Sequence, residues 1–460
     1  MTDLDSCDPL NWLSRILWPD GSTVIEPGGS SPQWWASPSA DGPKILIPAR
    51  CPAAARTSVR RYHDGFSPRL RMRSLLAEAL MRSESLAGLV LRTKMVGLSG
   101  PGSPHQGVLA GIADLMDVPD LQVAVSLSTP KSNQKPVLQL LDPTGRCLGW
   151  AKVAWNDRTE ALVANEAFWL RKQAPAPLSI PALLHDVEIA GRRVAISSGV
   201  DVSRRPRRSP AALPPVDVFH AVAGLGSTDI VPVRQSEWWR SVERVLDHAT
   251  ERERTAMVAA VDSCSPLRLR VGAWHGDLTP WNLMTTAGRV HLIDWEFAAD
   301  GVPIGFDLCH FHTQVASEMK GSAPLGDDAR RAAIAIDHSA RLSPHGLAKL
   351  GVEPENRTAV WRLYLVELIR RRLALRADGY PTDQISQGSA ALDRLERAVG
   401  IHDGSAPVDR YRSGTEAGAE SPVSDDGQRS RFSELLASDG GTADADRYAV
   451  REQETGVKAR

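Results

Sequence analysis

The feature that most constrains this chain is a group of polar residues between apolar segments, beyond the middle of the sequence. Asp277 is followed five residues later by Asn282, and Asp294 comes twelve residues after Asn282, directly behind the apolar segment 290–293. One acid can accept a proton from a hydroxyl group, while an amide and a second acid can hold a metal ion against nucleotide phosphates. Packing alone does not require this order, so the spacing favours a magnesium-dependent phosphoryl-transfer site.

Composition and charge limit the partners of the chain. Its 460 residues are 42% hydrophobic and 24% charged, which allows two or three globular domains. A formal net charge of −1 gives no reason to expect nucleic acid or a membrane as a partner. No apolar run approaches the roughly 20 residues of a membrane span, the first residues are acidic, and the five cysteines are scattered. We expect a cytoplasmic protein with reduced thiols, and the sequence leaves its oligomeric state open.

A small sheet domain is predicted over residues 119–199, because short apolar runs there alternate with turn residues. The single helix expected in it follows the third strand and is ended by prolines. The predicted elements are strands at 121–128, 137–141 and 147–155, a helix at 158–173, and strands at 182–189 and 193–198.

A helical domain is predicted over residues 200–402, after a connector rich in proline and arginine at 203–210. Its helices are expected at 215–223, 237–249, 251–261, 307–319, 327–340, 358–377 and 384–398. Residues 403–460 contain too few apolar side chains to offset the entropy of an ordered chain, so a disordered tail is expected there.

Residues 1–118 form an N-terminal extension of unknown role. An apolar helix face is expected at 10–18, a loop around Trp34 and Trp35, a strand at 44–48, and a helix at 70–91 with arginines beside it. Clustered aromatic residues usually mark a contact surface. We therefore expect these aromatic side chains to dock onto the domain that follows.

Two motifs resemble those of a known family. They are His275-Gly276-Asp277 with Asn282, and Ile293-Asp294-Trp295-Glu296. Together with the order of the domains, they resemble the protein-kinase-like fold and, more narrowly, the aminoglycoside phosphotransferase and choline kinase branch. The resemblance covers about residues 120 to 400. It implies an α+β, bilobal fold with a small antiparallel-sheet N-lobe and a mainly helical C-lobe, here flanked by the N-terminal extension and the tail.

The resemblance also implies roles for the polar residues of these motifs. Asp277 is expected to accept the proton of the substrate hydroxyl, and Asn282 and Asp294 to bind magnesium. His275 is expected to orient the catalytic loop, the segment from His275 to Asn282, without acting as a base. Glu296 and Asp307 match further acidic positions of the branch, and Asp307 is expected to accept hydrogen bonds from the catalytic loop rather than to bind a ligand.

A kinase-like lobe also needs a lysine on its third strand and a glutamate on the next helix, which together place the nucleotide phosphates. Lys152 lies on the predicted third strand, and Glu166 lies fourteen residues later within the predicted helix. Either residue alone is typical of a solvated surface. Both residues, on the expected elements and in the expected order, favour a phosphate-binding pair.

The segment expected to cover the phosphates, residues 129–136, departs from the family because it contains no glycine. Without glycine, backbone amides approach the phosphates less closely, so the side chain of Ser128, Lys131, Ser132 or Lys135 is expected to replace those contacts. The adenine is expected beside residues 197–200, with Val200 in the cofactor site.

These residues predict an ATP- and Mg²⁺-dependent phosphotransferase that acts on a hydroxyl of a small molecule, such as an aminoglycoside, a sugar or an amino alcohol. The alternative is a catalytically weak or inactive scaffold of the same fold, which the glycine-free segment favours. A protein kinase is disfavoured, because Gly276 replaces the arginine of those enzymes and few residues separate Asp294 from Asp307.

Overall fold

The computed structural model describes residues 9–20, 26–27, 33–36, 45–62, 96–99, 107–127, 133–200, 213–286, 289–319, 328–379 and 386–401. All of them belong to the first of two compact units, Met1–His402. The helix expected at 70–91, the connector at 203–210 and the tail at 403–460 lie outside the described residues.

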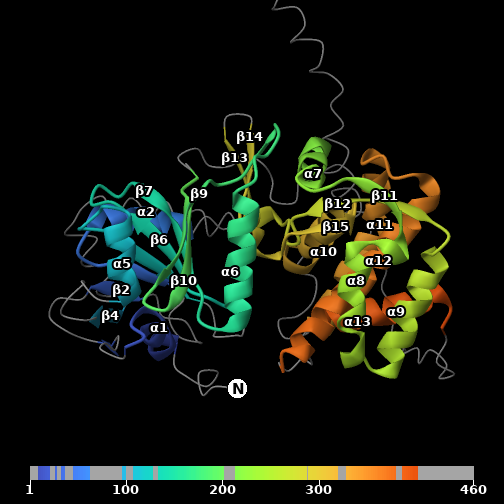
Figure 1. The fold of residues 1–460 in the computed structure, drawn as a ribbon, viewed down its shortest axis with the longest axis horizontal. Coiled ribbons are helices and arrows are strands. Elements are labelled where there is room, and N and C mark those ends of the chain that lie inside the picture. Colours follow the sequence, from blue (N-terminus) through green and yellow to red (C-terminus); the bar gives the residue numbers. More distant parts are fainter. Residues whose placement is uncertain are drawn as a thin grey trace, which may run out of the picture. The chain divides into compact units, whose positions relative to one another are not determined.

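A nine-stranded sheet dominates the first half of the chain, in the order β1-β4-β2-β3-β5-β6-β7-β10-β9, and every neighbouring pair is antiparallel (Figure 1). The strands predicted in residues 119–199 are present. The strands of the sheet are β1 (Glu26–Pro27), β2 (Trp34–Ala36), β3 (Ile45–Pro48), β4 (Val96–Ser99), β5 (Gln122–Ser126), β6 (Val137–Leu141), β7 (Cys147–Val153), β9 (Leu183–Ile189) and β10 (Arg192–Ser198).

The expected loop around Trp34 and Trp35 is wrong, since both residues lie in strand β2. This strand pairs with β3 on one side and with β4, some 60 residues further along the chain, on the other. The proline, serine and glycine residues around the two tryptophans gave a turn signal. Pairing with two partner strands overrides it, because strand formation depends strongly on such neighbours.

The N-terminal aromatic residues dock onto the sheet, as expected. Helix α1 (Pro9–Leu17) carries Trp12, which is fully buried in one core with Val125 and Val153. The rings of Trp12 and Trp155 meet edge to face, 6.0 Å apart. Helices α2 (Pro52–Tyr62) and α5 (Gly107–Leu115) were not predicted. Because β3 pairs with β5, residue 118 does not coincide with a break in the sheet.

Helix α6 (Asp157–Leu170) packs beside β10 and positions Glu166 (Figure 1). It begins at a side-chain cap on Asn156. The Asn156 side chain accepts a hydrogen bond from the Thr159 backbone amide at 2.8 Å, and the Thr159 hydroxyl accepts one from the Asn156 amide at 3.0 Å. Such a reciprocal cap satisfies amide groups that the first helical turn leaves unpaired.

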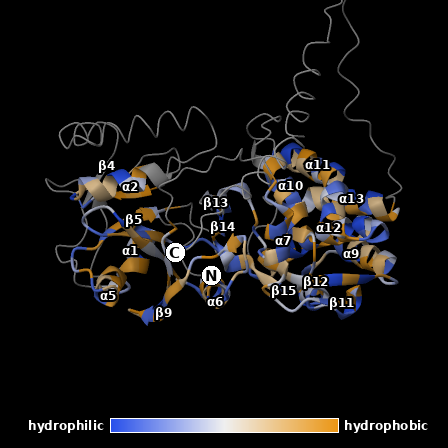
Figure 2. Cartoon of the chain, turned by 90° about the horizontal axis from the view of Figure 1, so that it is seen from above, coloured by the Kyte–Doolittle hydropathy of each residue, from blue (hydrophilic) through white to orange (hydrophobic). Residues whose placement is uncertain are grey.

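The second half of the chain is mainly helical, as predicted. Figure 2 shows hydrophilic and hydrophobic residues on different faces of helices such as α9 and α13, as expected where one face is buried. Helix α12 is buried more completely, with Leu363, Leu365 and Ile369 fully inaccessible. The helices are α7 (Val216–Ala223), α8 (Glu237–Glu243), α9 (Glu251–Cys264), α10 (Phe306–Met319), α11 (Asp328–Lys349), α12 (Pro354–Ala377) and α13 (Ser386–Val399).

The helix predicted over 237–249 is shorter than expected, because α8 ends at Glu243 and a separate 3-10 turn follows at Leu246–His248. None of the described helices is both long and apolar enough to cross a membrane.

Two small sheets hold the segment that carries the polar motifs. One contains β11 (Asp229–Pro232), β12 (Arg268–Trp274) and β15 (Ala299–Pro303), and the other contains β8 (Leu178–Ser179), β13 (Leu283–Thr286) and β14 (Arg289–Leu292). The catalytic loop starts directly after β12, and the β13–β14 hairpin separates Asn282 from Asp294. The apolar strand predicted at 290–293 is β14.

Candidate active site

The catalytic loop is held at its start by Asp307, the second residue of α10. Its carboxylate accepts hydrogen bonds from the backbone amides of His275 at 2.8 Å and Gly276 at 3.1 Å. Gly276 has φ +80°, and a Cβ there would collide with the Phe297 carbonyl. Only glycine therefore fits this turn without displacing the backbone.

His275 connects the two motifs to each other. Its ring is buried, its Nε2 lies 3.0 Å from the Ile293 carbonyl, and its Nδ1 accepts the Asp277 backbone amide at 3.2 Å. These partners place the proton on Nε2, because a carbonyl can only accept. Burial lowers the pKa of His275 to about 4, so the ring is neutral at pH 7. Both ring nitrogens are engaged, which leaves His275 no capacity to act as a base.

The carboxylate of Asp277 is held on both oxygens. Oδ2 accepts the Asn282 side-chain amide at 2.9 Å, and Oδ1 lies 3.1 Å from His310 Nε2. The side chain is still 26% exposed, so another molecule can reach it. Burial opposes ionisation, but the hydrogen bond from His310, together with the charge interactions with His310, His275 and Arg371, outweighs it and lowers the pKa of Asp277 below its ordinary value.

His310 was not predicted as a site residue. The structure places His310 on α10 with Nε2 on Asp277 and Nδ1 3.2 Å from the Tyr364 hydroxyl. Its spacing of three residues from Asp307 is the signal that could have found it, because such residues share a helix face.

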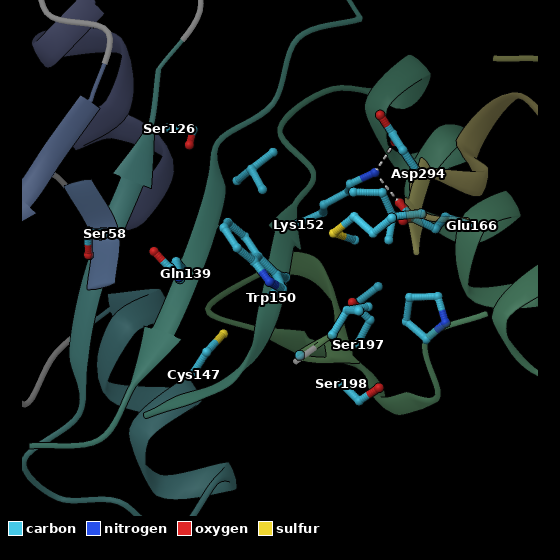
Figure 3. Close-up of a pocket in the computed structure, with 18 of the residues that line it drawn as sticks. Ser58, Ser126, Gln139, Cys147, Trp150, Lys152, Glu166, Ser197, Ser198 and Asp294 are labelled. Atoms are coloured by element: carbon cyan, nitrogen blue, oxygen red, sulfur yellow. Dashed lines mark hydrogen bonds and ion pairs between the residues drawn. The ribbon is translucent and has the colours of Figure 1, made fainter. Parts of the chain in front are cut away.

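On the sheet side, Lys152 of β7 lies among three carboxylates. Its Nζ is 2.5 Å from Glu166 Oε2 and also contacts Asp294 Oδ1 (Figure 3). The same Nζ lies 3.0 Å from Glu296 Oε2. Burial disfavours the ammonium ion, but the nearby carboxylates, Asp294 first, raise the pKa of Lys152 well above its ordinary value. Burial raises the pKa of Glu166 to about 7.

Lys135 adds a second ammonium group to this cluster. Its Nζ lies 2.5 Å from Glu296 Oε2, and the Lys135 side chain is only 4% exposed. In this cluster two lysines thus face three acids. Within the described part of the chain, Glu166, Asp294 and Glu296 are the group of acids whose oxygens lie close enough to share a metal ion.

The oxygen donors expected to hold magnesium are suitable for that ion. Both side-chain N–H bonds of Asn282 are directed to Asp277, to its backbone carbonyl and to Oδ2, so the amide oxygen remains as an acceptor. Asp294 has φ +72°, an uncommon conformation for any residue other than glycine. Amide and carboxylate oxygens are ligands that Mg²⁺ prefers.

We call the group of Lys135, Lys152, Glu166, Asp294 and Glu296 the lysine cluster. A cavity of about 1000 Å³ opens beside it. Lys152, Glu166 and Asp294 line one end, and Val200 lies in its wall, where the adenine was expected. This volume is at the upper end of the range of about 300–1,000 Å³ that is usual for ligand sites. The structure therefore brings Lys152, Glu166, Asp294 and Glu296 together, and it groups Asp277 with Asn282, His275 and Asp307.

These features define the class of protein. An antiparallel sheet with a lysine, a following helix with its glutamate partner, and a helical part with the acid–amide–acid motif make up the protein-kinase-like fold. Residues 151–345 match the phosphotransferase enzyme family, APH. The family resemblance that the two motifs indicated is thus confirmed, and the match supports a small-molecule phosphotransferase.

Several solved structures are similar to this chain. A thermostable mutant of aminoglycoside phosphotransferase APH(4)-Ia, in ternary complex with AMP-PNP and hygromycin B, is 17% identical, with a TM-score of 0.40, over 64% of this chain and 99% of that chain. Choline kinase LicA from Streptococcus pneumoniae is 13% identical, with a TM-score of 0.41, over 64% and 97%. Amicoumacin kinase hAmiN, in complex with AMP-PNP, Ca²⁺ and Ami, is 12% identical, with a TM-score of 0.35, over 61% and 87%. No protein of curated function matches the chain.

Proposed function

We propose that this protein is an ATP- and Mg²⁺-dependent phosphotransferase that transfers the terminal phosphate to a hydroxyl group of a small molecule. The observation that carries the proposal is the contact of Lys152 with Glu166 and Asp294. Residues of the sheet, of α6 and of the second motif meet there at one end of a large cavity. A phosphate lysine beside a metal-binding acid is the arrangement that phosphoryl transfer uses.

Each polar residue then has a role that its geometry permits. Lys152, oriented by Glu166, binds the nucleotide phosphates, and Asn282 and Asp294 supply oxygen ligands to magnesium. When bound, the metal neutralises charge on the phosphates. Asp277, ionised at pH 7, accepts a hydrogen bond from the acceptor hydroxyl and takes its proton as the phosphoryl group is transferred.

Lys135 replaces part of what a glycine-rich loop provides. It is buried beside the phosphate end of the cavity and is directed at Glu296. A lysine there binds phosphate as a point charge and does not require the close backbone approach that glycine allows. The absence of glycine from residues 129–136 is thereby compatible with an active enzyme.

The class of acceptor is proposed from the similar structures. Aminoglycoside, sugar and amino-alcohol hydroxyls are the candidates, since the similar structures include one with hygromycin B and a choline kinase. Asp277 has to be within hydrogen-bond reach of the acceptor. The acceptor therefore binds on the exposed side of that carboxylate.

Two measurements test the proposal. Thermal unfolding with ATP, with and without Mg²⁺, is expected to show metal-dependent stabilisation of the wild type that Asp294→Ala loses. ADP release with a panel of small hydroxyl compounds is expected to depend on Asp277. The matched control is Asp247→Ala, because the Asp247 side chain is 94% exposed and outside the cavity. A wild type that Mg²⁺ and ATP do not stabilise would instead support the inactive scaffold.

A further inference from the structure

Lys135 is held in one position although its side chain is long and flexible. The side chain is only 4% exposed, and its Nζ lies 2.5 Å from Glu296 Oε2. Burying a lysine costs more rotamer entropy than burying most other residues. Residues 129–136 contain no glycine that would bring their amides close to the phosphates, so this lysine matters all the more. The backbone that carries it is therefore expected to be fixed by contacts of its neighbours.

Trp155 fixes this backbone on one side of Lys135. Its indole N–H donates to the Gln134 carbonyl at 2.6 Å. On the other side, the Val153 backbone amide donates to the Pro136 carbonyl at 3.4 Å. The carbonyls of both chain neighbours of the lysine are therefore bound by residues at the end of β7 and just beyond it.

Trp155 is itself fixed by the start of α6 and by β10. Its backbone amide donates to Thr159 Oγ1 at 2.9 Å, and its carbonyl accepts from Arg192 Nη1 at 3.1 Å. It follows Lys152 by three residues and comes just before α6, the helix that carries Glu166. One residue thus joins both members of the phosphate-binding pair to the second lysine.

The ring of Trp155 packs against the N-terminal extension. Trp12 of α1 is fully buried, and its ring meets that of Trp155 edge to face, with 6.0 Å between the ring centroids. Both rings belong to one apolar core, together with Leu13 and Ile16 of the same helix. Aromatic pairs in this geometry attract each other beyond the burial of their surfaces. The extension therefore restricts the orientation of the indole that binds the segment of the lysine.

We propose that the N-terminal extension positions Lys135 for phosphate binding, through the ring contact between Trp12 and Trp155. This inference rests on the proposed function and gives the extension a part in the phosphate site. Trp12 and Trp155 are positioning residues, because neither is among the described residues that line the cavity. Trp12 and Lys135 precede the range 151–345 that matches the family, so the family match does not account for this arrangement.

The physical effect of this positioning is limited to the phosphates. A lysine attracts phosphate as a point charge, and the attraction falls as the distance between the charges grows. Without the indole hydrogen bond to Gln134, the Lys135 side chain regains orientations in which its ammonium group lies away from the phosphates. Contacts to the nucleoside do not change. The expected result is a loss of affinity that depends on the phosphates of the ligand.

The test measures the affinity of ATP by calorimetry, with Mg²⁺ and without acceptor, and that of adenosine by competition with ATP. Trp155→Phe keeps a ring at this position but removes the indole N–H. It is expected to weaken ATP binding by roughly three- to tenfold, the scale of one hydrogen bond, and to leave adenosine affinity unchanged. Lys135→Met should have a similar effect. The double variant should bind ATP no more weakly than Lys135→Met alone, because the two residues act as a unit.

Trp12→Leu tests the part of the extension. It removes the ring contact with Trp155 and should weaken ATP binding in the same direction but to a smaller extent than Trp155→Phe. The effect should disappear when Lys135→Met is also present. Trp12→Phe is the conservative variant, which keeps an aromatic ring and should restore part of the ATP affinity. The unfolding temperature of each variant shows that it is folded.

The matched control is Trp34→Phe. Trp34 lies in the same apolar core as Trp155, and its indole N–H also donates to a backbone carbonyl, that of Val123, at 2.9 Å. This variant should lower the unfolding temperature about as much as Trp155→Phe does. It should leave ATP affinity unchanged, so that a loss of core stability is separated from a loss of positioning.

The outcomes separate this inference from the proposed function. The inference is wrong if Trp155→Phe leaves ATP affinity unchanged, weakens ATP and adenosine alike, or adds its full effect to that of Lys135→Met. It is also wrong if Lys135→Met or Trp12→Leu does not change ATP affinity. In each of these cases the phosphotransferase proposal stands, provided that the wild type binds ATP with Mg²⁺. If the wild type binds no ATP, both proposals are wrong.

Discussion

The catalytic loop and the lysine cluster differ in how their polar groups are paired. Around Asp277, neutral side chains and backbone amides satisfy one another, so that the carboxylate is fixed before any ligand arrives. Around Lys152, three carboxylates share two ammonium groups, and burial raises the pKa of one of these carboxylates, Glu166, to about 7. The comparison suggests that the first region provides geometry and that the second exchanges partners when metal and nucleotide bind.

The substitution Asp277→Asn tests the role of the region around Asp277. It keeps the shape and the contact with Asn282 but removes the proton acceptor, so kcat is expected to fall by about 10²–10⁴-fold. The KM for ATP should change little, because Asp277 does not line the cavity. Steady-state ADP release measures both quantities. A fall in ATP affinity with an unchanged kcat would contradict the assigned role.

Glu367→Gln tests the support behind the catalytic loop. Glu367 is buried against Arg370 and Arg371, and Arg371 donates to the Gly276 carbonyl at 2.6 Å. Breaking a buried pair typically costs about 3–5 kcal/mol, so the variant should unfold at clearly lower denaturant concentration at pH 7.

The pH dependence of this effect has a definite sign. Burial opposes ionisation of Glu367, but Arg370 and Arg371 together outweigh it and lower the pKa to about 2, below the ordinary value near 4.5. The stabilisation is therefore complete above about pH 4.5 and is lost as the pH falls towards 2. Denaturation of wild type and variant across this range should show curves that converge in acid. Parallel curves would exclude an ionised Glu367.

His310→Phe tests whether the hydrogen bond from α10 positions Asp277. We expect kcat to fall by about tenfold, the usual scale for one hydrogen bond to a charged group. Losing that bond should also raise the pKa of Asp277, so the acidic limb of the kcat profile moves to higher pH. His310→Gln, which can still donate, should restore part of both. If the pH profile of kcat is the same in His310→Phe as in the wild type, His310 contributes only to packing.

Lys135→Met addresses the lysine cluster and carries the smallest expected effect. Lys152 remains to bind phosphate, so the KM for ATP should rise only several-fold, at unchanged KM for the acceptor. Lys172→Met is the control, because Lys172 lies over the rings of Phe168 and Trp169 outside the cavity. An unchanged KM for ATP would show that Lys135 serves only to pair Glu296.

The sequence was informative where function depends on local spacing. Asp277, Asn282 and Asp294 lie within eighteen residues, and Lys152 and Glu166 within fifteen, so one strand, one helix and one hairpin are enough to order them. Their roles remain predictions, but the family and the fold that they indicated are confirmed.

Features that depend on distant partners were not visible in the sequence. Trp34 pairs with a strand at residues 96–99, and Arg371 reaches a carbonyl 95 residues earlier.

The pairing of β3 with β5 has a consequence for any shortened form of the protein. Residues 122–198 resemble a self-contained lobe in sequence, and β5 would be its outer strand. Cutting the chain before Gln122 would leave the backbone groups of β5 open to another chain, which is the usual origin of edge-to-edge aggregation. The extension therefore acts as a built-in cover for this edge.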